Sequence, residues 1–511
     1  MNYHGKGMYQ WDTWYCKEKD SDRYHAFYLQ KCIPGGGRQE KEGESLGHAV
    51  STNLIDWQEL PPVLPPEKRG KRGDLQSWTG STIEHDGKYY MFYTIRSSES
   101  NTKVQEIGLA ESDDLMCWRK SEKNPVITPD PRWYNTEENP AENGLVDCRD
   151  LMVVKHPEQA GYFGVFATRV NTPTLQEGAV FAGAYTENFL DWEQTPPVFS
   201  SAENKYTIVE MPDLFYFEGK WYLTWLEDNQ YGNREILDDF FLTCGTVYAV
   251  SDKVEGPYLE PEDNTLMASM GYNGFSCRSV DFHGKKYMLH SMGTRIQENE
   301  QKAEFGALAI PKELRIVDGN LRMCYADLVE EKICCTLISP ETAAQVHDVR
   351  MFYENAGIWN HETGLTIGKV KYGWSRFGLW NQADNFIFTA SICIKEGIAA
   401  GLSLYCESGC VTTQSLAVML DVERQKVFCA SVPRFQISDM RPWKLEWGKL
   451  YSLKIVAVGK FLEVYLDEIL VLQLVNYFQP GKHLALMIDR CEAEFRNIGA
   501  WELSVPNSPK E

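Results

Sequence analysis

Asp86-Gly87-Lys88-Tyr89-Tyr90-Met91-Phe92-Tyr93 is the phrase that decides the fold, because it recurs along the chain. Each copy places a small turn before a run of aromatic and aliphatic residues, which is a hairpin signal. The other copies begin at Asp22, Ala160, Glu218 and His283, so the period is about 65 residues. That length holds about four strands of ordinary size with their turns.

A second phrase follows the first four copies, and three of its versions end in Trp. It spans Ser51–Trp57, Ser112–Trp118, Thr186–Trp192 and, in a degenerate form, Ser251–Pro257. Because both phrases recur in the same order, they predict five four-stranded units, hence a five-bladed β-propeller rather than unrelated hairpins of a sandwich. We interpret the repeated Trp57, Trp118 and Trp192 as packing residues.

The predicted domain boundaries follow the end of the repeat. We expect the propeller to span residues 1–325, with 310–315 as its closing strand, and a linker or short helix at 326–345. Residues 346–505 alternate apolar and polar side chains between turns, which predicts a β-sandwich. The fold class is therefore all-β, and we expect the tail, 506–511, to be loose.

Composition narrows the class of partner. The 511 residues are 43% hydrophobic and 24% charged, which is ordinary for a folded protein too long for one core. The net charge is −21, from 51 basic and 72 acidic residues. This charge argues against nucleic acid and anionic membranes as partners. No apolar run has the length of a membrane span, and Met1–Lys6 lacks the apolar region of a signal peptide.

The 14 cysteines are scattered along the chain. Since no CxxC pairs with a second CxxC or with spaced histidines, the sequence does not support a zinc site. We interpret the cysteines as reduced, mostly buried thiols, which predicts a cytoplasmic protein. The exposed-looking basic stretch at 68–72 is interpreted as a solvated loop, the alternative being a contact with a phosphorylated sugar.

The innermost strand of each propeller blade lines the central channel, so candidate site residues precede each hairpin phrase. Asp12, Asp150 and Glu210 occupy equivalent places before the first, third and fourth copies. Three carboxylates around one channel repel, which raises at least one pKa. Glycosidic bond cleavage needs such a combination of ionised and protonated carboxyl groups. Rings against which a sugar can stack are Trp11, Trp78 and Tyr272.

Each of these residues has an ordinary alternative explanation. A lone Asp in a β-protein loop is usually a turn former, and Arg149-Asp150 alone could be a structural ion pair. The coincidence of three acidic residues in repeat register favours a site.

The chain resembles the glycoside hydrolase family 32 enzymes, the invertase, inulinase and levanase group. The resemblance is carried by LGHAVSTNLIDWQELP at 46–61, by Arg149-Asp150, and by Glu210-Met211-Pro212-Asp213-Leu214-Phe215, which is similar to that family's Glu-Cys-Pro-Asp-Leu-Phe motif. It spans nearly the whole chain, including the expected β-sandwich.

The resemblance implies a role for each matched residue. Asp12 would be the nucleophile, Asp150 the transition-state stabiliser and Glu210 the general acid/base. Arg149 would orient the carboxylates, Trp78 would line the furanose site, and Gln30 matches the Gln that follows the family's first aromatic strand. Trp11 and Tyr272 are expected to contact the substrate because of their position beside the channel. This sequence departs from the family pattern at three positions: Trp11 replaces the Asn before the nucleophile, Leu151 the Pro after Arg-Asp, and Met211 the Cys after the acid/base.

We therefore expect a retaining glycosidase, without metal or organic cofactor, acting on a β-fructofuranoside such as sucrose or a short fructo-oligosaccharide. A retaining mechanism predicts about 5–5.5 Å between the carboxyl groups of Asp12 and Glu210, and inversion more than about 6.5 Å. Two alternatives stay open: a propeller glycosidase of family 43 or a fructosyltransferase of family 68, and a carbohydrate-binding protein without catalysis. The β-sandwich is also a candidate contact for a homo-oligomer.

Overall fold

Strands dominate the computed structural model of this chain. It describes residues 1–175, 177–201, 206–228, 235–237, 240–242, 244–269, 274–293, 306–339, 357–362, 364–379, 384–407 and 414–505. Helical segments in these ranges are short 3₁₀ turns, among them η1 (Glu40–Glu44), η2 (Glu142–Gly144) and η5 (Asp327–Lys332). None of the helices in the described ranges has the length and apolar character needed to cross a membrane.

The repeated phrase forms hairpins, as the sequence predicts. Asp86 and Gly87 join two paired strands, and both have positive φ, at 50° and 80°. Two central residues with positive φ match the twist of the flanking strands, and Gly adopts this conformation without strain. Glu218-Gly219 and His283-Gly284 repeat the arrangement.

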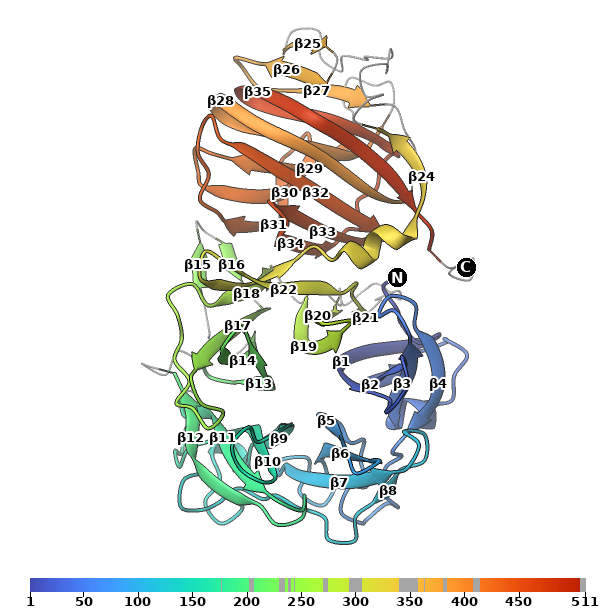
Figure 1. The fold of residues 1–511 in the computed structure, drawn as a ribbon, viewed down its shortest axis with the longest axis vertical. Coiled ribbons are helices and arrows are strands. Elements are labelled where there is room, and N and C mark those ends of the chain that lie inside the picture. Colours follow the sequence, from blue (N-terminus) through green and yellow to red (C-terminus); the bar gives the residue numbers. More distant parts are fainter. Residues whose placement is uncertain are drawn as a thin grey trace.

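Four four-stranded sheets stand apart from one another in Figure 1. The first contains β1 (Met8–Lys17), β2 (Tyr24–Cys32), β3 (Leu46–Ser51) and β4 (Gln58–Val63). The second contains β5 (Trp78–His85), β6 (Lys88–Ile95), β7 (Glu106–Ser112) and β8 (Arg119–Lys120). The third contains β9 (Cys148–Lys155), β10 (Tyr162–Arg169), β11 (Ala179–Thr186) and β12 (Glu193–Ser200), and the fourth β13 (Glu210–Phe217), β14 (Lys220–Asp228), β17 (Cys244–Ser251) and β18 (Thr265–Ser269). The short strands β15 (Glu235–Leu237) and β16 (Phe240–Leu242) pair with each other.

The expectation of five separate blades needs correction, because four such sheets are observed among the residues that the structure describes. The next strands are β19 (Phe275–Phe282), β20 (Lys285–Met292), β21 (Ala307–Leu308), β22 (Lys312–Val317) and β23 (Asn320–Cys324). They belong to a 17-stranded sheet that continues into the C-terminal domain. The physical link is a pairing of Cys324, at the end of β23, with Ile469 of that domain.

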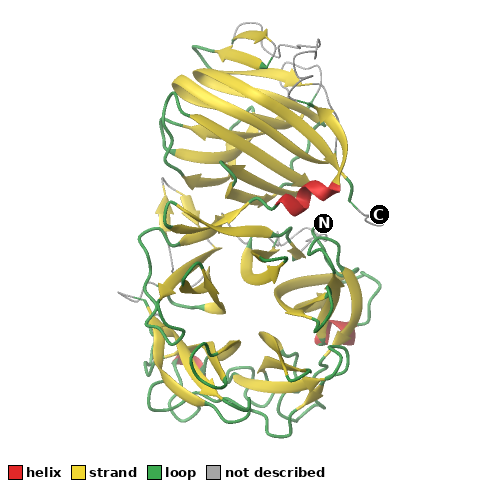
Figure 2. Cartoon of the chain, viewed as in Figure 1, coloured by secondary structure: helices red, strands yellow, loops and turns green. Residues whose placement is uncertain are grey.

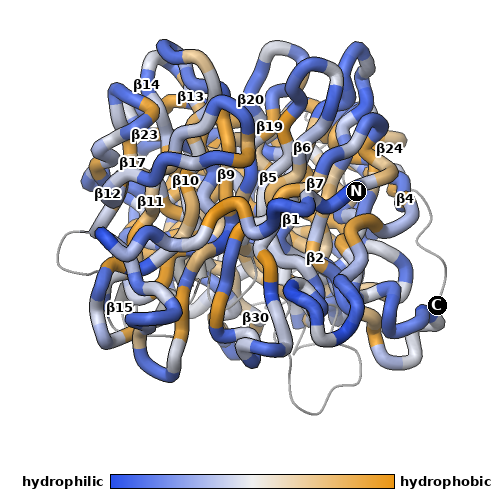
Figure 3. Tube along the Cα trace, turned by 90° about the horizontal axis from the view of Figure 1, so that it is seen from below, coloured by the Kyte–Doolittle hydropathy of each residue, from blue (hydrophilic) through white to orange (hydrophobic). Residues whose placement is uncertain are grey.

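The inner strands of the propeller form a ring (Figure 1). β1 contacts β5, β5 contacts β9, β9 contacts β13 and β13 contacts β19. The ring closes because β19 also contacts β1. In the hydropathy-coloured view of Figure 3, apolar segments follow the strands and most outer loops are hydrophilic. The apolar cores therefore lie between neighbouring sheets, as the aromatic clusters of the first four sheets illustrate.

The C-terminal part is a sheet-rich domain (Figure 2). Its strands are β24 (Ile333–Ile338), β25 (Ile358–Glu362), β26 (Leu365–Lys369), β27 (Trp374–Leu379), β28 (Asn385–Cys406), β29 (Ser415–Asp421), β30 (Lys426–Val432), β31 (Gln436–Pro442), β32 (Leu450–Val458), β33 (Phe461–Leu466), β34 (Ile469–Val475) and β35 (His483–Leu503). The long β28 and β35 pair with each other and carry much of one large apolar core. β24 pairs with β35, while 340–356 and the tail 506–511 lie outside the described residues.

The Trp-ending phrase forms the same turn three times. Trp57, Trp118 and Trp192 each donate the indole N–H to the carbonyl oxygen of the residue three positions earlier, at 3.0 Å in each case. Those earlier residues, Leu54, Leu115 and Phe189, have positive φ. Each half-buried indole also packs against an apolar cluster, which confirms the predicted packing role.

Candidate active site

Irregularities in the inner strands bring the candidate residues together. The pairing register shifts at Asp12 in β1, opposite Asp150 in β9, after Glu210 in β13 and after Phe275 in β19. A bulge turns a side chain away from the regular alternation of its strand. Asp12 and Asp150 have φ of 49° and 61°, which Asp tolerates better than most residues. The local bulges thus direct polar groups from several strands toward one region.

Asp12 is held by hydroxyl groups from the strands on both sides of it. Thr79, in β5, donates to Asp12 Oδ2 at 2.9 Å, and Ser276, in β19, donates to Oδ1 at 2.5 Å. Burial raises the pKa of Asp12 to about 6, the two hydroxyl groups oppose this rise, and the Glu210 carboxylate adds to it. Its side chain still keeps partial contact with solvent. Asp12 is therefore an oriented carboxyl group whose charge state changes near neutral pH.

Asp150 is deeply buried beside it. Its Oδ2 accepts the backbone N–H of Met211 at 3.0 Å, and its own N–H donates to Thr94 Oγ1 at 3.1 Å. Burial raises the pKa of Asp150 to about 6 against the opposing effect of Arg149, and the charge of Asp12 contributes to the rise. The charges of Asp12 and Asp150 therefore influence each other.

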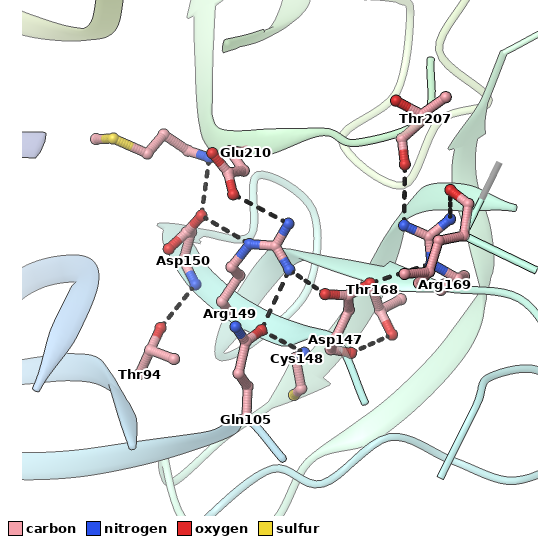
Figure 4. A network of polar contacts seen from close by, with 12 residues as sticks. Thr94, Gln105, Asp147, Cys148, Arg149, Asp150, Thr168, Arg169, Thr207 and Glu210 are labelled. Carbon is pink, nitrogen blue, oxygen red and sulfur yellow. Dashed lines mark hydrogen bonds and ion pairs between the residues drawn. The ribbon is translucent and has the colours of Figure 1, made fainter. Parts of the chain in front are cut away.

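Arg149 connects the acidic groups (Figure 4). Its guanidinium lies 2.5 Å from Asp147 Oδ1, 3.2 Å from Glu210 Oε1 and 3.8 Å from Asp150 Oδ2. It also donates to Gln105 Oε1 at 3.2 Å. Burial by itself would lower the pKa of Arg149, but the three carboxylates hold that pKa above its ordinary value.

Glu210 differs from Asp150 in its access to solvent. Its side chain is 32% exposed, whereas that of Asp150 is 5% exposed. It is the first residue of β13, directly before Met211, whose amide holds Asp150. A partly exposed carboxyl group tied to a buried arginine can exchange protons with a ligand or with water.

Sequence reasoning missed several residues of this site. Arg278 is buried, pairs with Asp213 at 4.0 Å and donates to the carbonyl oxygens of Pro212 and Gly80. Its charge lowers the pKa of both Asp12 and Asp150. Thr79, Thr94, Asp147 and Ser276 were missed as well. The available signal was their position, since all but Thr94 lie in the segments that precede the hairpin phrases.

The predicted substrate-contacting residues differ in burial and in the groups that they contact. Trp78 is half-buried, and the Arg96 guanidinium lies 3.6 Å from its ring centroid. Trp11 packs against Leu226 and Phe275. The buried Gln30 donates its side-chain N–H to the Glu42 carbonyl oxygen at 2.9 Å.

Tyr272, also predicted, lies outside the described residues. The structure therefore groups Asp12, Asp150, Glu210 and Arg149, while the sugar contacts of the rings and of Gln30 stay predictions. In the described ranges, no group of three or more His, Cys, Asp or Glu side chains is arranged to hold a metal ion.

The exposed basic residues at 68–72 match the predicted solvated loop. Arg72 contributes one ion pair there, at 3.4 Å to Glu106.

Comparisons with known proteins point to one family. A family model described as the glycosyl hydrolases family 32 N-terminal domain matches residues 18–323. β-Fructofuranosidase 1 of Zea mays is 37% identical over 89 residues, which cover 17% of this chain and 13% of the maize protein. The sequence match thus spans a small part of that relative's length.

Solved structures are similar over almost the whole chain. A β-fructofuranosidase from Bombyx mori in complex with sucrose superposes with a TM-score of 0.65 at 18% identity, covering 95% of this chain and 90% of the other. An exo-inulinase from Aspergillus awamori gives a TM-score of 0.68 at 16% identity, covering 98% and 97%. At these identities the likeness shows a shared fold.

Proposed function

Because this chain belongs to glycosyl hydrolase family 32, we propose that it hydrolyses β-fructofuranosides through two carboxyl groups, with retention at the anomeric carbon. The observation that carries the proposal is that Arg149 pairs with both Asp150 and Glu210, while the charge of Asp12 interacts with both of these carboxyl groups. The sucrose complex of the similar Bombyx mori enzyme supports a small sugar substrate of this class.

In the first step Glu210 donates its proton to the glycosidic oxygen while an Asp12 oxygen attacks the anomeric carbon. The bond from that carbon to the leaving oxygen breaks, and the leaving sugar departs as an alcohol. Asp12 suits the nucleophile because Thr79 and Ser276 orient it and because it is ionised above a pH of about 6. Glu210 suits the acid because its carboxyl group is partly exposed.

In the second step water attacks the anomeric carbon and gives its proton to Glu210. The bond to Asp12 breaks, which regenerates the Asp12 carboxylate and releases the sugar. Asp150, held by the Met211 amide, would accept hydrogen bonds from sugar hydroxyl groups and stabilise positive charge at the ring.

The test compares Glu210→Gln with Glu218→Gln, an exposed glutamate in the turn at the other end of β13. We expect Glu210→Gln to lose about 10²–10⁴-fold in kcat on sucrose and short fructans, and Glu218→Gln to retain wild-type turnover. Product chromatography on sucrose, fructans and difructose anhydrides measures both. A Glu210→Gln variant as fast as wild type would remove Glu210 from the acid/base role.

We also propose that β19, β20, β22 and β23 act as a fifth blade, because β19 contacts both β1 and β13 and supplies Ser276 to Asp12. With that blade the catalytic domain would span 1–325, followed by a linker at 326–345 that contains η5 and β24, and by a two-layered β-sandwich at 346–505, whose β35 pairs with β24.

Two further proposals concern the whole protein. Cytoplasmic residence is supported by twelve cysteines of the described residues, which are free thiols. Self-association through the C-terminal domain is supported by large exposed apolar residues there, including Tyr372, Trp447 and Tyr477. Light scattering of the purified protein tests the second proposal, and a monomer at all concentrations would contradict it.

A further inference from the structure

A groove in the C-terminal domain, remote in sequence from the candidate active site, has the composition of a ligand site. Its volume is about 450 Å³, within the range of small-molecule sites. We call it the η5 groove, and it is lined by Glu330, Thr389, Ser391, Ser452, Lys454 and Trp501, among others. None of these residues contributes to the site around Asp12.

Strand register explains why polar groups gather in the groove. In the pairing of β28 with β32, Thr389 lies opposite Lys454 and Ser391 lies opposite Ser452. Residues two apart in a strand point to the same face. The sheet therefore presents hydroxyl groups in a row along one face, and Asn497 of β35 adds an amide that donates to Ser391 Oγ at 3.2 Å.

An indole ring forms one end of this surface. Trp501, in β35, lies opposite Ile387 of β28 and is half-buried. A Cβ placed on Gly499 would lie 2.4 Å from Trp501 Cη2, so the ring occupies the space over this glycine. Because position 499 has no side chain, the indole can lie close against the sheet backbone, and part of it remains open to a ligand.

Several polar groups of the groove lack protein partners. The hydroxyl groups of Thr389 and Ser452 and the carboxylate of Glu330 make no side-chain hydrogen bond or ion pair with any residue that the structure describes. Lys454, by contrast, is paired with Glu468 at 3.0 Å and lies 3.5 Å from the Tyr325 ring centroid. The cation is therefore already compensated, while an acidic group is free, which disfavours an anionic ligand.

We propose that the η5 groove binds a neutral oligosaccharide. A sugar ring has an apolar face that stacks on an indole, and its hydroxyl groups both donate to and accept from Thr, Ser, Asn and Glu side chains. The groove offers these groups side by side without a free positive charge. The inference goes beyond the proposed hydrolysis, since it assigns a second carbohydrate site outside the catalytic residues.

A second carbohydrate site of this kind would strengthen the binding of longer glycans. A chain held in the η5 groove stays attached to the protein after each encounter, which raises the effective concentration of its other units near the protein. Loss of the groove should therefore weaken binding of long chains and leave a disaccharide unaffected.

The test is calorimetric titration of the full-length Glu210→Gln protein, which limits turnover during the measurement. The probes are inulin-type fructo-oligosaccharides of about five to ten units, maltohexaose and xylohexaose. Trp501→Ala and Thr389→Val are the groove variants. Trp447→Ala, at an exposed Trp of the same domain, and Thr128→Val, at an exposed Thr in a loop of the propeller, are the matched controls.

We expect at least one probe to bind the parent, and we expect Trp501→Ala and Thr389→Val to weaken that probe about tenfold while the controls bind like the parent. Thr389→Val preserves side-chain volume, so it distinguishes lost contacts from misfolding. If no probe binds, or if both groove variants bind like the parent, the proposal is overturned.

The outcome is separable from that of the proposed function. Sucrose turnover in the Glu210-intact protein with Trp501→Ala or Thr389→Val should equal that of wild type. A chain that binds oligosaccharide through Trp501 but turns over no fructofuranoside would overturn the hydrolase proposal and uphold the groove.

Discussion

At the scale of single residues, the candidate site keeps two carboxyl groups in surroundings that oppose their charge. Burial raises the pKa of Asp12 and of Asp150 to about 6, and the nearby hydroxyl, amide and guanidinium groups only partly offset it. A carboxyl group with a raised folded-state pKa stabilises the fold below its unfolded pKa, and this contribution is lost as pH rises through the folded pKa. At neutral pH the ionised Asp12 therefore destabilises the protein.

Replacing Asp12 by Asn should separate stability from activity. We expect Asp12→Asn to raise the free energy of unfolding by about 1–3 kcal/mol at pH 7, because about two pKa units of unfavourable ionisation are removed. The gain should fade as the pH falls from about 6 to about 3, because below the unfolded-state pKa of about 3.9 the wild-type carboxyl group is protonated in both states. Urea unfolding at several pH values measures it. A gain that persists in full at a pH of about 3, or none at pH 7, would contradict the assignment of the raised pKa to Asp12.

The hydroxyl group of Ser276 should set the acidic limb of the activity profile. It donates to Asp12 and lowers the pKa of that carboxyl group. Since Asp12 must be ionised to attack, we expect kcat/KM to fall below a pH of about 6 in wild type and Ser276→Ala to move that limb upward by about one unit. The control is Ser98→Ala, which removes the same kind of bond to the partly exposed Asp74, outside the candidate site. An unshifted limb in Ser276→Ala would argue against Asp12 as the group that titrates.

At the scale of elements, β-bulges in the inner strands determine where the side chains of the candidate site point. Regular strands would alternate side chains between two faces, whereas the bulges at Asp12 and near Asp150 break this alternation. The outer turns are regular by contrast, since three of them repeat the same indole-to-carbonyl hydrogen bond. Function and stability thus reside in different parts of one repeat.

The Trp turns should therefore affect stability alone. Trp192→Phe removes the hydrogen bond to the Phe189 carbonyl, and we expect it to cost about 1 kcal/mol. Trp192→Ala should cost about 2–3 kcal/mol, because the half-buried ring also packs between sheets. In both variants kcat per folded molecule should equal wild type. Trp447→Phe, at a more exposed indole–carbonyl bond, should change the unfolding free energy by less than about 0.5 kcal/mol.

At the scale of the whole molecule, a buried ion pair joins the two domains. Lys312 of β22 is fully buried and contacts Glu463 of β33, while Tyr465 donates to the same carboxylate at 2.5 Å. Lys312 also lies 2.9 Å from His290 Nε2. Burial lowers the pKa of Lys312, and Glu463 opposes this. The two domains are thus joined by two buried charges, each of which compensates the other.

Replacing one partner of the Lys312–Glu463 ion pair should strongly destabilise the fold. We expect Lys312→Met to lose about 3–5 kcal/mol of unfolding free energy, because Glu463 is left as an uncompensated buried charge. Glu463→Gln keeps a hydrogen-bond acceptor for Tyr465 but leaves Lys312 as a buried charge without a counter-charge. It should therefore lower the free energy of unfolding by a similar amount. The double variant should be less destabilised than the sum of the singles, as measured by urea unfolding. Additive losses would show that the two groups do not interact energetically.

Much of the fold could be predicted from local patterns. The hairpin at Asp86-Gly87 and the packing role of Trp57 depend on residues close together in sequence, and both predictions are confirmed. The described residues form four separate four-stranded sheets where the sequence predicts five, because β23 pairs with a strand that follows more than a hundred residues later. Pairing between distant strands has no local signature.

The sequence by itself determined the all-β repeat and the register that places Asp12, Asp150 and Glu210 on inner strands, since turn chemistry and strand alternation act over a few residues. Only the tertiary structure decided which groups surround them. Thr79 and Ser276 reach Asp12 from strands 67 and 264 residues away, and Lys312 meets Glu463 across 151 residues. Such partners are chosen by packing of the whole chain, because hydrogen bonds and charge compensation depend on distance in space and not on distance along the sequence.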